Sequence, residues 1–193
     1  MLATGNKGKL AEFQRLLGDR VELQSLDDAG YQHELPEPGT TYEDNARAKA
    51  EAVRDATGMP ALADDSGIEV AALGGWPGLH SARWMGEEAT DRDRLLGLLA
   101  RVAAQAPGDR RARYVAAVAL SRPGQSTVTA TGTCNGVLVD PPRGTGGFGY
   151  DPAFLSDDLG VTFGEAGDAL KDTVSHRARA LRALLDTGVL EQL

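Results

Sequence analysis

Cysteine is nearly absent from this chain of 193 residues, which holds a single one, Cys134. One cysteine forms no disulfide within the chain, so the sequence excludes a disulfide-stapled scaffold and fits a reducing, cytoplasmic compartment. Cys134 lies in an alternating Thr/Val pattern that is typical of a strand. That setting favours a structural thiol over a nucleophile.

Long apolar runs are lacking as well. None approaches the roughly 18 residues that a membrane-spanning helix needs. Residues 1–5 have neither the basic segment nor the long apolar core of a signal peptide. We therefore expect a cytoplasmic protein that has no membrane partner.

Positive charge is in deficit, because 20 Lys and Arg stand against 28 Asp and Glu and give a formal net charge of -8. This balance argues against a nucleic-acid partner gripped over a wide face, but it leaves room for a small nucleotide held by a local cluster of cations. The hydrophobic content of 41% and the charged content of 25% are ordinary for a globular protein. The length predicts one domain, residues 1–193, with a sizeable core.

Two adjacent carboxylates, Asp64 and Asp65, follow a short apolar run that we interpret as the end of a buried strand. Neighbouring side chains on a strand point to opposite faces, so at most one of the two faces a given pocket unless the chain turns, which Gly67 makes easy. Oxygen ligands at a strand end suit Mg²⁺. The alternative, favoured on the pair alone, is that Asp64 caps a helix or turn and that Asp65 is solvated.

A glycine-rich basic loop, residues 4–9, opens the chain. Apolar residues then recur at helical spacing as far as Leu17, and Gly18 is placed to end the helix. Backbone N–H groups at a helix N-terminus attract anions, and glycines let a phosphate approach closely. The spacing is not that of the Walker motif. The alternative is a plain turn with solvated lysines.

A second glycine-rich stretch covers residues 144–152 and holds four glycines, two aromatic residues and an acid. Phe148 and Tyr150 offer ring faces on which a base can stack. Asp151 can hydrogen-bond the edge of that base. The alternative is an ordinary mobile loop, and the interleaved aromatic residues favour the binding interpretation.

Helical and strand patterns alternate in the first half of the chain, and the second half is rich in hairpin signals. This order predicts an α/β fold with a mixed sheet. We expect one helix that begins after a cap at Thr41 and two more over residues 91–105 and 173–186. Strands are expected at residues 21–23, 68–70, 114–120, 127–133 and 137–139. A turn at Asn135-Gly136 is expected between the last two strands.

Cations gather where the last helix is expected to begin: Lys171, His176 and Arg177, beside Ser175. Positive charge is disfavoured at a helix N-terminus, so these side chains call for an anionic or electron-rich partner. Glu37, between two prolines, is by itself an exposed loop acid, and Lys49 is by itself either solvated or turned inward. Trp76 and Trp84 are expected in a core or an interface.

Five stretches together resemble the non-canonical purine nucleoside triphosphate pyrophosphatases, the dITP/XTP or Ham1-like family. In family order they are Thr4-Gly5-Asn6-Lys7-Gly8-Lys9, Ala63-Asp64-Asp65-Ser66-Gly67, Ser81-Ala82-Arg83, Gly146-Gly147-Phe148-Gly149-Tyr150-Asp151-Pro152 and Ser175-His176-Arg177. The resemblance spans essentially the whole chain. It implies a mixed twisted sheet with flanking helices, two lobes around a central nucleotide-binding cleft, a homodimer, and one or more Mg²⁺ ions per subunit. It also implies hydrolysis of ITP, dITP and XTP to the monophosphate and pyrophosphate.

The resemblance also implies roles for individual residues. Asp65 corresponds to the proton acceptor and a metal ligand, Glu37 to the other metal-binding acid, and Lys49 to a catalytic lysine that contacts the triphosphate. The phosphate-binding loop is Thr4, Gly5, Asn6, Lys7, Gly8 and Lys9. The other substrate-binding positions are Ser66, Phe148, Gly149, Tyr150, Asp151, Lys171, His176 and Arg177.

Base choice follows from donors aimed at the purine 6-position. A keto oxygen accepts from His176 or Arg177, whereas the amino group of adenine presents donor to donor. The alternative for Arg177 is that it binds only phosphate or a nearby acid. Two rival functions are a pyrophosphatase for modified pyrimidine nucleotides and a non-enzymatic nucleotide sensor; Glu37, Asp65 and Lys49 together speak against the sensor.

The chain departs from the family pattern at its start. Family members usually have several strand residues before the Thr-Gly-Asn motif, and here Met1 and Leu2 alone precede Ala3. We expect a short first strand, or a recorded start that lies downstream of the natural one.

Overall fold

The computed structural model describes residues 1–18 and 21–189, which form two compact units. The first unit contains Met1–Asp65, Ala116–Gly132 and the chain from Arg177 onwards, and the second contains Ser66–Val115 and Thr133–His176. The chain passes between the units four times: after Asp65, after Val115, after Gly132 and after His176. The expectation of a single domain over residues 1–193 stays a prediction.

Four strands form one sheet in the order β1-β2-β3-β4. They are β1 (Ala61–Val70), β2 (Arg111–Ser121), β3 (Val128–Leu138) and β4 (Phe154–Ser156). β3 and β4 are antiparallel, whereas Leu2 forms a parallel bridge to Leu62, so the expected short first strand is one bridged residue. The α/β class with a sheet and flanking helices is confirmed; the central cleft between two lobes stays a prediction.

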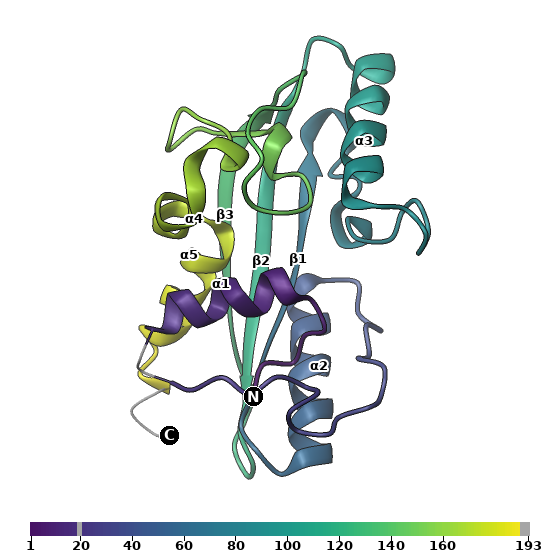
Figure 1. Cartoon of the computed structure of the whole chain (residues 1–193). Coiled ribbons are helices and arrows are strands. Elements are labelled where there is room, and N and C mark those ends of the chain that lie inside the picture. The colour runs from purple at the N-terminus through teal and green to yellow at the C-terminus, as the bar shows by residue number, and fades with distance from the viewer. Residues whose placement is uncertain (19–20, 190–193) are drawn as a thin grey trace. The chain divides into compact units, whose positions relative to one another are not determined.

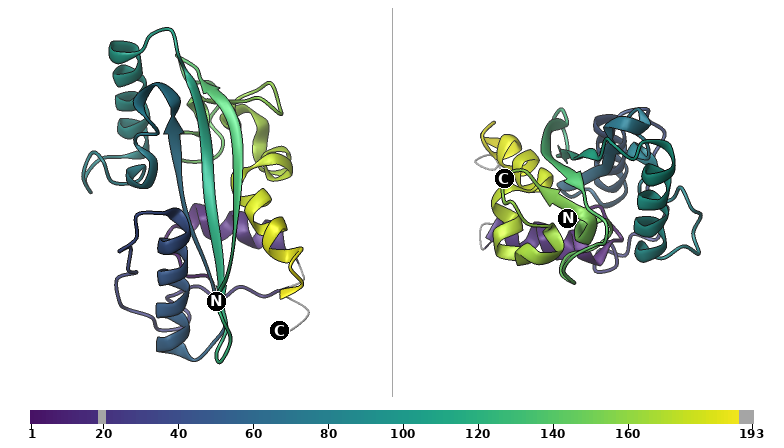
Figure 2. Two further views of the ribbon diagram at one scale, coloured as in Figure 1. Left: turned by 180° about the vertical axis from the view of Figure 1, so that it is seen from behind. Right: turned by 90° about the horizontal axis from the view of Figure 1, so that it is seen from above.

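The first unit has a core between helices and strands. α1 (Lys7–Leu17) ends at Gly18 as expected, with φ of 58° at that glycine. α5 (His176–Leu185) belongs to this unit after its first residue. Phe13 of α1 and Leu184 of α5 share one buried cluster with Leu62 and Val118, and Figures 1 and 2 show the two helices side by side. These contacts fix the start of α1 against the sheet.

α2 (Tyr42–Thr57) is the third helix of the first unit. Its expected cap is confirmed, because Thr41 Oγ1 accepts a hydrogen bond from Asp44 N at 3.1 Å. Gly58 ends the helix in the left-handed region, with φ of 67°. Residues 21–23 form no strand, contrary to expectation.

The second unit places helices on either side of its strands (Figure 1). α3 (Asp91–Gln105) has the expected bounds, and its stripe of Leu95, Leu98, Leu99 and Val102 is buried. α4 (Phe163–Val174) carries Phe163 into the same core as that stripe. β4 and α4 were not expected from the sequence.

Two glycines that were expected to mark turns lie inside continuous strands. β1 runs through Gly67, where an added Cβ would overlap the Gly78 carbonyl oxygen and lie 2.7 Å from Ser81 Oγ. β3 runs through Gly136, where a Cβ would overlap the carbonyl oxygen of Leu155 in the neighbouring strand β4. The turn predicted at Asn135-Gly136 is therefore wrong, and the turn that Gly67 would make easy does not occur, because each glycine admits a close neighbour instead.

The boundary of the last helix also differs from expectation. α4 ends at Val174, Ser175 is extended with ψ of 153°, and α5 begins at His176. Lys171 therefore lies in α4, whereas His176 and Arg177 start the next helix. The extended residue Ser175 therefore separates Lys171 from His176 and Arg177, which were expected together at the start of one helix.

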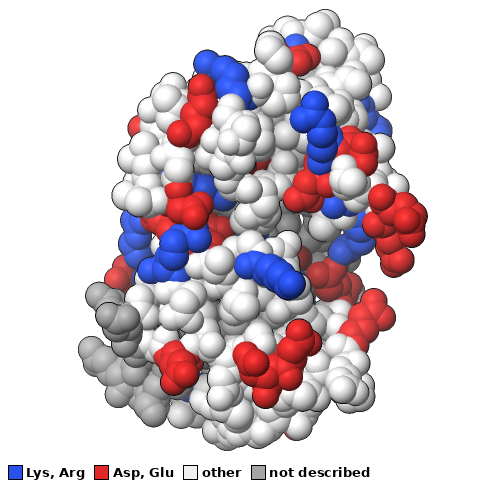
Figure 3. All heavy atoms as spheres, viewed as in Figure 1, with Lys and Arg blue, Asp and Glu red and all other residues white. Residues whose placement is uncertain are grey.

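Basic and acidic side chains are interspersed on the face shown in Figure 3. Among the described residues, no helix is long and apolar enough to cross a membrane. Four of the candidate cations are instead buried: Lys49, Lys171, His176 and Arg177.

Candidate active site

The first unit contains a set of buried or half-buried polar side chains, which we call the charge cluster. They come from α1, the loop before α2, α2 itself, the middle of β1 and the start of α5. Its members are Lys9, Glu12, Glu37, Asn45, Lys49, Asp64, Asp65 and Arg177.

Asp64 is the centre of one half of the charge cluster. Lys9 Nζ lies 2.9 Å from Asp64 Oδ2, and Arg177 Nε donates to the same oxygen at 3.1 Å. Arg177 also donates through Nη1 to Glu12 Oε2 at 3.0 Å. Burial alone would raise the pKa of Asp64, but the charges of Lys9 and Arg177 hold that pKa well below its ordinary value. Asp64 is therefore an ionised anchor for two cations.

Lys49 is the centre of the other half. Its Nζ donates to Glu37 Oε1 at 3.1 Å and to Asp65 Oδ1 at 3.2 Å. Burial alone would lower the pKa of Lys49, but the carboxylates of Asp65, Asp64 and Glu37 outweigh it and raise that pKa, so the ammonium stays charged. Asn45 Nδ2 donates to the second oxygen of Asp65 at 3.0 Å.

The two neighbouring aspartates thus have separate partners. Asp64 binds Lys9 and Arg177, whereas Asp65 binds Lys49. This confirms that adjacent side chains of β1 face different ways. Because β1 is continuous, no turn brings both carboxylates to one point.

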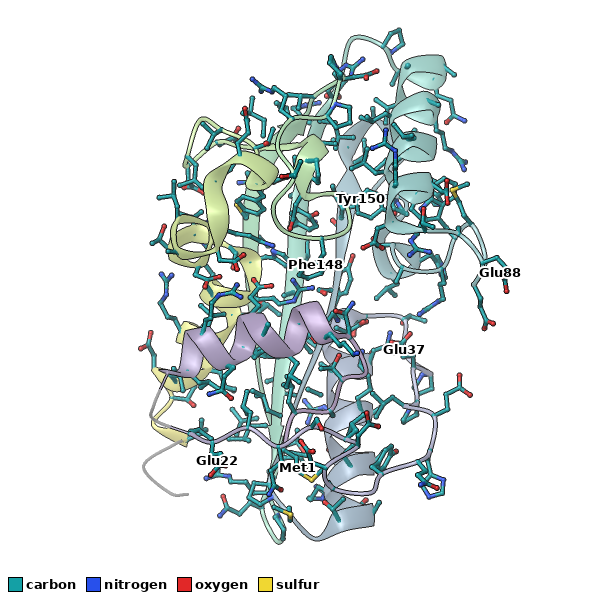
Figure 4. All side chains as sticks on the ribbon, viewed as in Figure 1. Met1, Glu22, Glu37, Glu88, Phe148 and Tyr150 are labelled. Carbon is teal, nitrogen blue, oxygen red and sulfur yellow. The ribbon has the colours of Figure 1, made fainter. Side chains whose placement is uncertain are left out.

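Glu37 and Asp65 are the pair that suits a divalent cation. Both carboxylates reach the single ammonium of Lys49, so they converge on one positive charge. Glu37 lies on the loop that leads to α2 (Figure 4), and 29% of its side chain is exposed. Among the described residues, no three His, Cys, Asp or Glu gather as a closed metal site. Mg²⁺ needs only one or two carboxylates with water and substrate phosphates, so these two residues fit it.

The loop before α1 has the geometry expected of residues 4–9. Asn6 caps the helix, since its Oδ1 accepts from Lys9 N at 3.1 Å, and Thr4 Oγ1 accepts from Asn6 N at 3.2 Å. An added Cβ at Gly5 would meet nothing within 4 Å. Gly5, Asn6 and Lys7 are exposed at this end of the helix, and the phosphate-binding role of the loop stays a prediction.

The second unit contains a different set, which we call the aromatic cluster: Tyr114, Phe148, Asp151, Phe154, Phe163, Lys171 and His176. Its acid, Asp151, pairs with Lys171 at 2.7 Å, and each of these side chains is 3% exposed. Lys171 Nζ lies 4.8 Å from the centroid of the half-buried Phe148 ring. The cluster therefore couples one ion pair to a ring that solvent reaches.

Residues 1–187 match the model of the Ham1 family. This chain belongs to the Ham1 family. It is 49% identical over 189 residues to a dITP/XTP pyrophosphatase of Symbiobacterium thermophilum, covering 96% of this chain and 92% of the relative. It is 45% identical over 190 residues to a dITP/XTP pyrophosphatase of Bacillus licheniformis, covering 96% and 97%.

Solved structures of Ham1 proteins share the fold. The Staphylococcus aureus Ham1 protein superposes with a TM-score of 0.85 at 34% identity, covering 100% of this chain and 98% of that one. A nucleoside-triphosphatase, or dITP/XTP pyrophosphatase, of Mycobacterium abscessus gives 0.75 at 42% identity, covering 95% and 97%. The resemblance drawn from five sequence stretches is confirmed.

Within this Ham1 chain, Tyr150 differs from Phe148 in what its side chain does. Its hydroxyl donates to Ser81 O at 2.7 Å and accepts from Trp84 Nε1 at 2.8 Å. Burial raises the pKa of Tyr150 to about 12. Both residues lie on the loop before β4 (Figure 4), but Tyr150 is 5% exposed and packs in the core. Phe148 is the better platform for a base.

Sequence reasoning missed five members of the two clusters: Glu12 and Asn45 of the charge cluster, and Tyr114, Phe154 and Phe163 of the aromatic cluster. Glu12 lies three residues after Lys9 on α1, and Asn45 lies four residues before Lys49 on α2, so helical spacing could have indicated both. Tyr114 gave no signal, since it reads as one apolar position of a buried strand. The two tryptophans of the expected interface contact each other, with ring centroids 4.7 Å apart; their role in a dimer stays a prediction.

Proposed function

We propose that this chain hydrolyses the non-canonical purine triphosphates ITP, dITP and XTP to the monophosphate and pyrophosphate, with Mg²⁺ as cofactor. The observation that carries the proposal is the convergence of Glu37 and Asp65 on Lys49, within one cluster that also holds Lys9. Membership of the Ham1 family supports it, as do relatives named dITP/XTP pyrophosphatase at 42–49% identity. The names of these relatives support a hydrolase that acts on nucleoside triphosphates.

The charge cluster is assigned to the triphosphate, which carries about four negative charges that a protein must offset with cations. Lys9 is the more accessible cation, because 17% of its side chain is exposed at the N-terminal turn of α1. Lys49 is 5% exposed and held by two carboxylates. Both lysines offset charge on the departing pyrophosphate.

Glu37 and Asp65 would hold Mg²⁺, which when bound offsets phosphate charge and makes a coordinated water more acidic. Asp65 accepts the proton of the water whose oxygen forms the new bond to the α-phosphorus. The bond that breaks joins this phosphorus to the oxygen bridging to the β-phosphorus, and its electron pair leaves with pyrophosphate. Asn45 and Lys49 hold the two oxygens of Asp65 in place for this step.

Two members of the aromatic cluster, Phe148 and His176, are assigned to the base. Phe148 supplies a ring face, and His176 supplies the donor to the purine 6-keto oxygen. Arg177 is assigned to the charge cluster, because its guanidinium binds Asp64 and Glu12 within the first unit. Its contacts favour the alternative in which it binds an acid and does not read the base.

We also propose that the working form is a cytoplasmic homodimer, as the family resemblance implies. Sedimentation at micromolar concentration tests this against the chain mass of 20.3 kDa. A particle of one chain mass would contradict the dimer and leave the hydrolysis untouched.

Pyrophosphate release from a panel of nucleotides tests the function. The panel is ITP, dITP, XTP, GTP, ATP and UTP, each with Mg²⁺ and with EDTA. We expect pyrophosphate release from ITP, dITP and XTP when Mg²⁺ is present and no release with EDTA. Release from UTP and none from ITP would favour the pyrimidine enzyme, and binding of ITP with no release would favour the sensor.

A further inference from the structure

Three segments of the second unit meet at one residue of β2, Tyr114. Its side chain contacts the loop before β4 through Asp151, α4 through Phe163, and the end of the unit through His176. The hydroxyl of Tyr114 is already bound to Asp151, and its ring already stacks with those of His176 and Phe163. Tyr114 is therefore placed to act on the proposed base site through other residues.

The hydroxyl of Tyr114 completes the hydrogen bonds of a buried ion pair. It donates to Asp151 Oδ1 at 3.1 Å, while Asp151 Oδ2 accepts from Lys171 Nζ at 2.7 Å and from Phe148 N at 2.9 Å. A buried carboxylate is held well only when both oxygens have donors. Tyr114 thus helps to fix the acid that holds the backbone under the Phe148 ring.

The ring of Tyr114 lies in a stack of parallel rings. The His176 ring is 4.5 Å away at 7°, and the Phe163 ring is 6.0 Å away at 10°. Such spacings and angles are favourable for aromatic pairs. The imidazole of His176 cannot rotate freely about its Cβ–Cγ bond while it is stacked on the Tyr114 ring. Tyr114 therefore fixes the plane of the imidazole and so the directions in which its two nitrogens point.

We propose that Tyr114 is a positioning residue for base selection, which orients His176 through its ring and the Phe148 loop through its hydroxyl. The proposal rests on the proposed function of His176 and Phe148. It adds a residue that touches neither base nor phosphate and still sets the preference for a 6-keto purine. Because Tyr114 lies on a strand of the sheet, the orientation is built into the fold before substrate binds.

The two parts of Tyr114 have separable effects. Tyr114→Phe keeps the ring and removes the donor to Asp151, so the KM for ITP is expected to rise about 3- to 10-fold with kcat within about twofold, a change of the size that one ordinary hydrogen bond contributes. Tyr114→Leu removes the ring stack. The ratio of kcat/KM for ITP to that for ATP is expected to fall at least about fivefold. This ratio does not depend on the fraction of folded enzyme.

A matched control comes from the same core. Phe154→Leu removes a ring whose centroid lies 4.7 Å from that of Tyr114, at 60° and outside the parallel stack. It is expected to lower stability and leave the ITP to ATP ratio unchanged. A second readout is the NMR shift of the His176 ring protons, which the neighbouring ring current displaces; Tyr114→Phe should preserve that displacement and Tyr114→Leu should remove it.

An unchanged ratio in Tyr114→Leu, or an equal fall in Phe154→Leu, would overturn the role of the ring. A lower kcat at constant KM in Tyr114→Phe would overturn the role of the hydroxyl. If Tyr114→Leu does not fold, the KM and kcat of Tyr114→Phe and its His176 shifts decide. If the wild type does not hydrolyse ITP, the proposed function fails, and the same variants compared for ITP binding by calorimetry still decide the role of Tyr114.

Discussion

Each unit of the molecule contains a buried lysine paired with an aspartate, and the two pairs differ in how they are held. Lys49 shares its ammonium between Asp65 and Glu37 at 3.1–3.2 Å. Among the described residues, Lys171 pairs with one carboxylate, that of Asp151, at 2.7 Å, and the rings of Phe148 and Phe163 lie near its ammonium. The first pair lies among charges and the second among rings.

The two Lys–Asp pairs are therefore expected to have different roles. A lysine shared by two carboxylates leaves a second acid beside it, so both acids remain suited to a divalent cation. A short pair whose two side chains are each 3% exposed and lie among aromatic rings is a fixed support, since breaking it leaves a buried charge without a partner. Asp65 is therefore expected to act in chemistry, and Asp151 in holding the base site.

Asp65→Asn should have the largest effect. The change keeps size and removes the charge that binds metal and accepts the proton, so kcat for ITP is expected to fall at least about 10³-fold. Thermal unfolding should stay close to wild type, because Lys49 keeps Glu37. Turnover of ITP near the wild-type rate would show that Asp65 is not the proton acceptor.

Asp151→Asn should instead destabilise the fold. It leaves the ammonium of Lys171 buried without its carboxylate, which costs about 3–5 kcal/mol in the free energy of unfolding. Urea unfolding of this variant beside Asp65→Asn makes the comparison direct. Equal midpoints for the two variants would contradict the distinction between an acid for chemistry and an acid for support.

His176 and Arg177 are adjacent in the chain and belong to different units, so they sharpen the comparison further. His176→Ala should lower the selectivity for ITP over ATP about 10- to 150-fold, the range for one hydrogen bond from a charged donor. Arg177→Ala should lower kcat/KM for both nucleotides alike, because Arg177 binds Asp64 and Glu12. The measurement is kcat/KM for ITP and for ATP in each variant. A loss of selectivity in both variants would mean that Arg177 also contacts the base.

Tyr150 gives the smallest expected effect, at alkaline pH. Burial raises its pKa from 10.0 to about 12. The folded protein therefore keeps the proton longer than the unfolded chain, so this contribution to stability is intact below pH 10 and is lost as pH rises toward 12, by up to about 2 kcal/mol. Tyr150→Phe should flatten the fall in stability across that window. An equally steep fall in the variant would mean that another group titrates there.

Much of the fold could be predicted where one element carries its own signal. α3 has its expected bounds because a leucine stripe is bracketed by polar ends. The sequence around Gly67 and Gly136 did not indicate why a glycine is needed at each position. The backbone that leaves no room for a side chain is that of Gly78 at Gly67 and that of Leu155 at Gly136, and both are distant in the sequence. α4 went unrecognised, since Gly167 interrupts it with φ of 69°.

The site could be predicted only in part. Asp65 stood out as a carboxylate at a strand, but the grouping of Glu37 with Lys49 came from the family resemblance. The contacts of Arg177 with Asp64 and Glu12 join residues 113 and 165 positions apart. Contacts over such separations leave no local pattern in the sequence, and the structure was needed to find them.

The central claim is that the charge cluster binds the triphosphate and that Phe148 and His176 of the aromatic cluster bind the base. Calorimetry with two partial ligands, magnesium tripolyphosphate and inosine, tests it most directly in wild type, Lys49→Met and His176→Ala. The account predicts that Lys49→Met weakens tripolyphosphate at least about tenfold and leaves inosine unchanged, and that His176→Ala does the reverse. A variant that weakens both ligands to the same degree would contradict the division of labour.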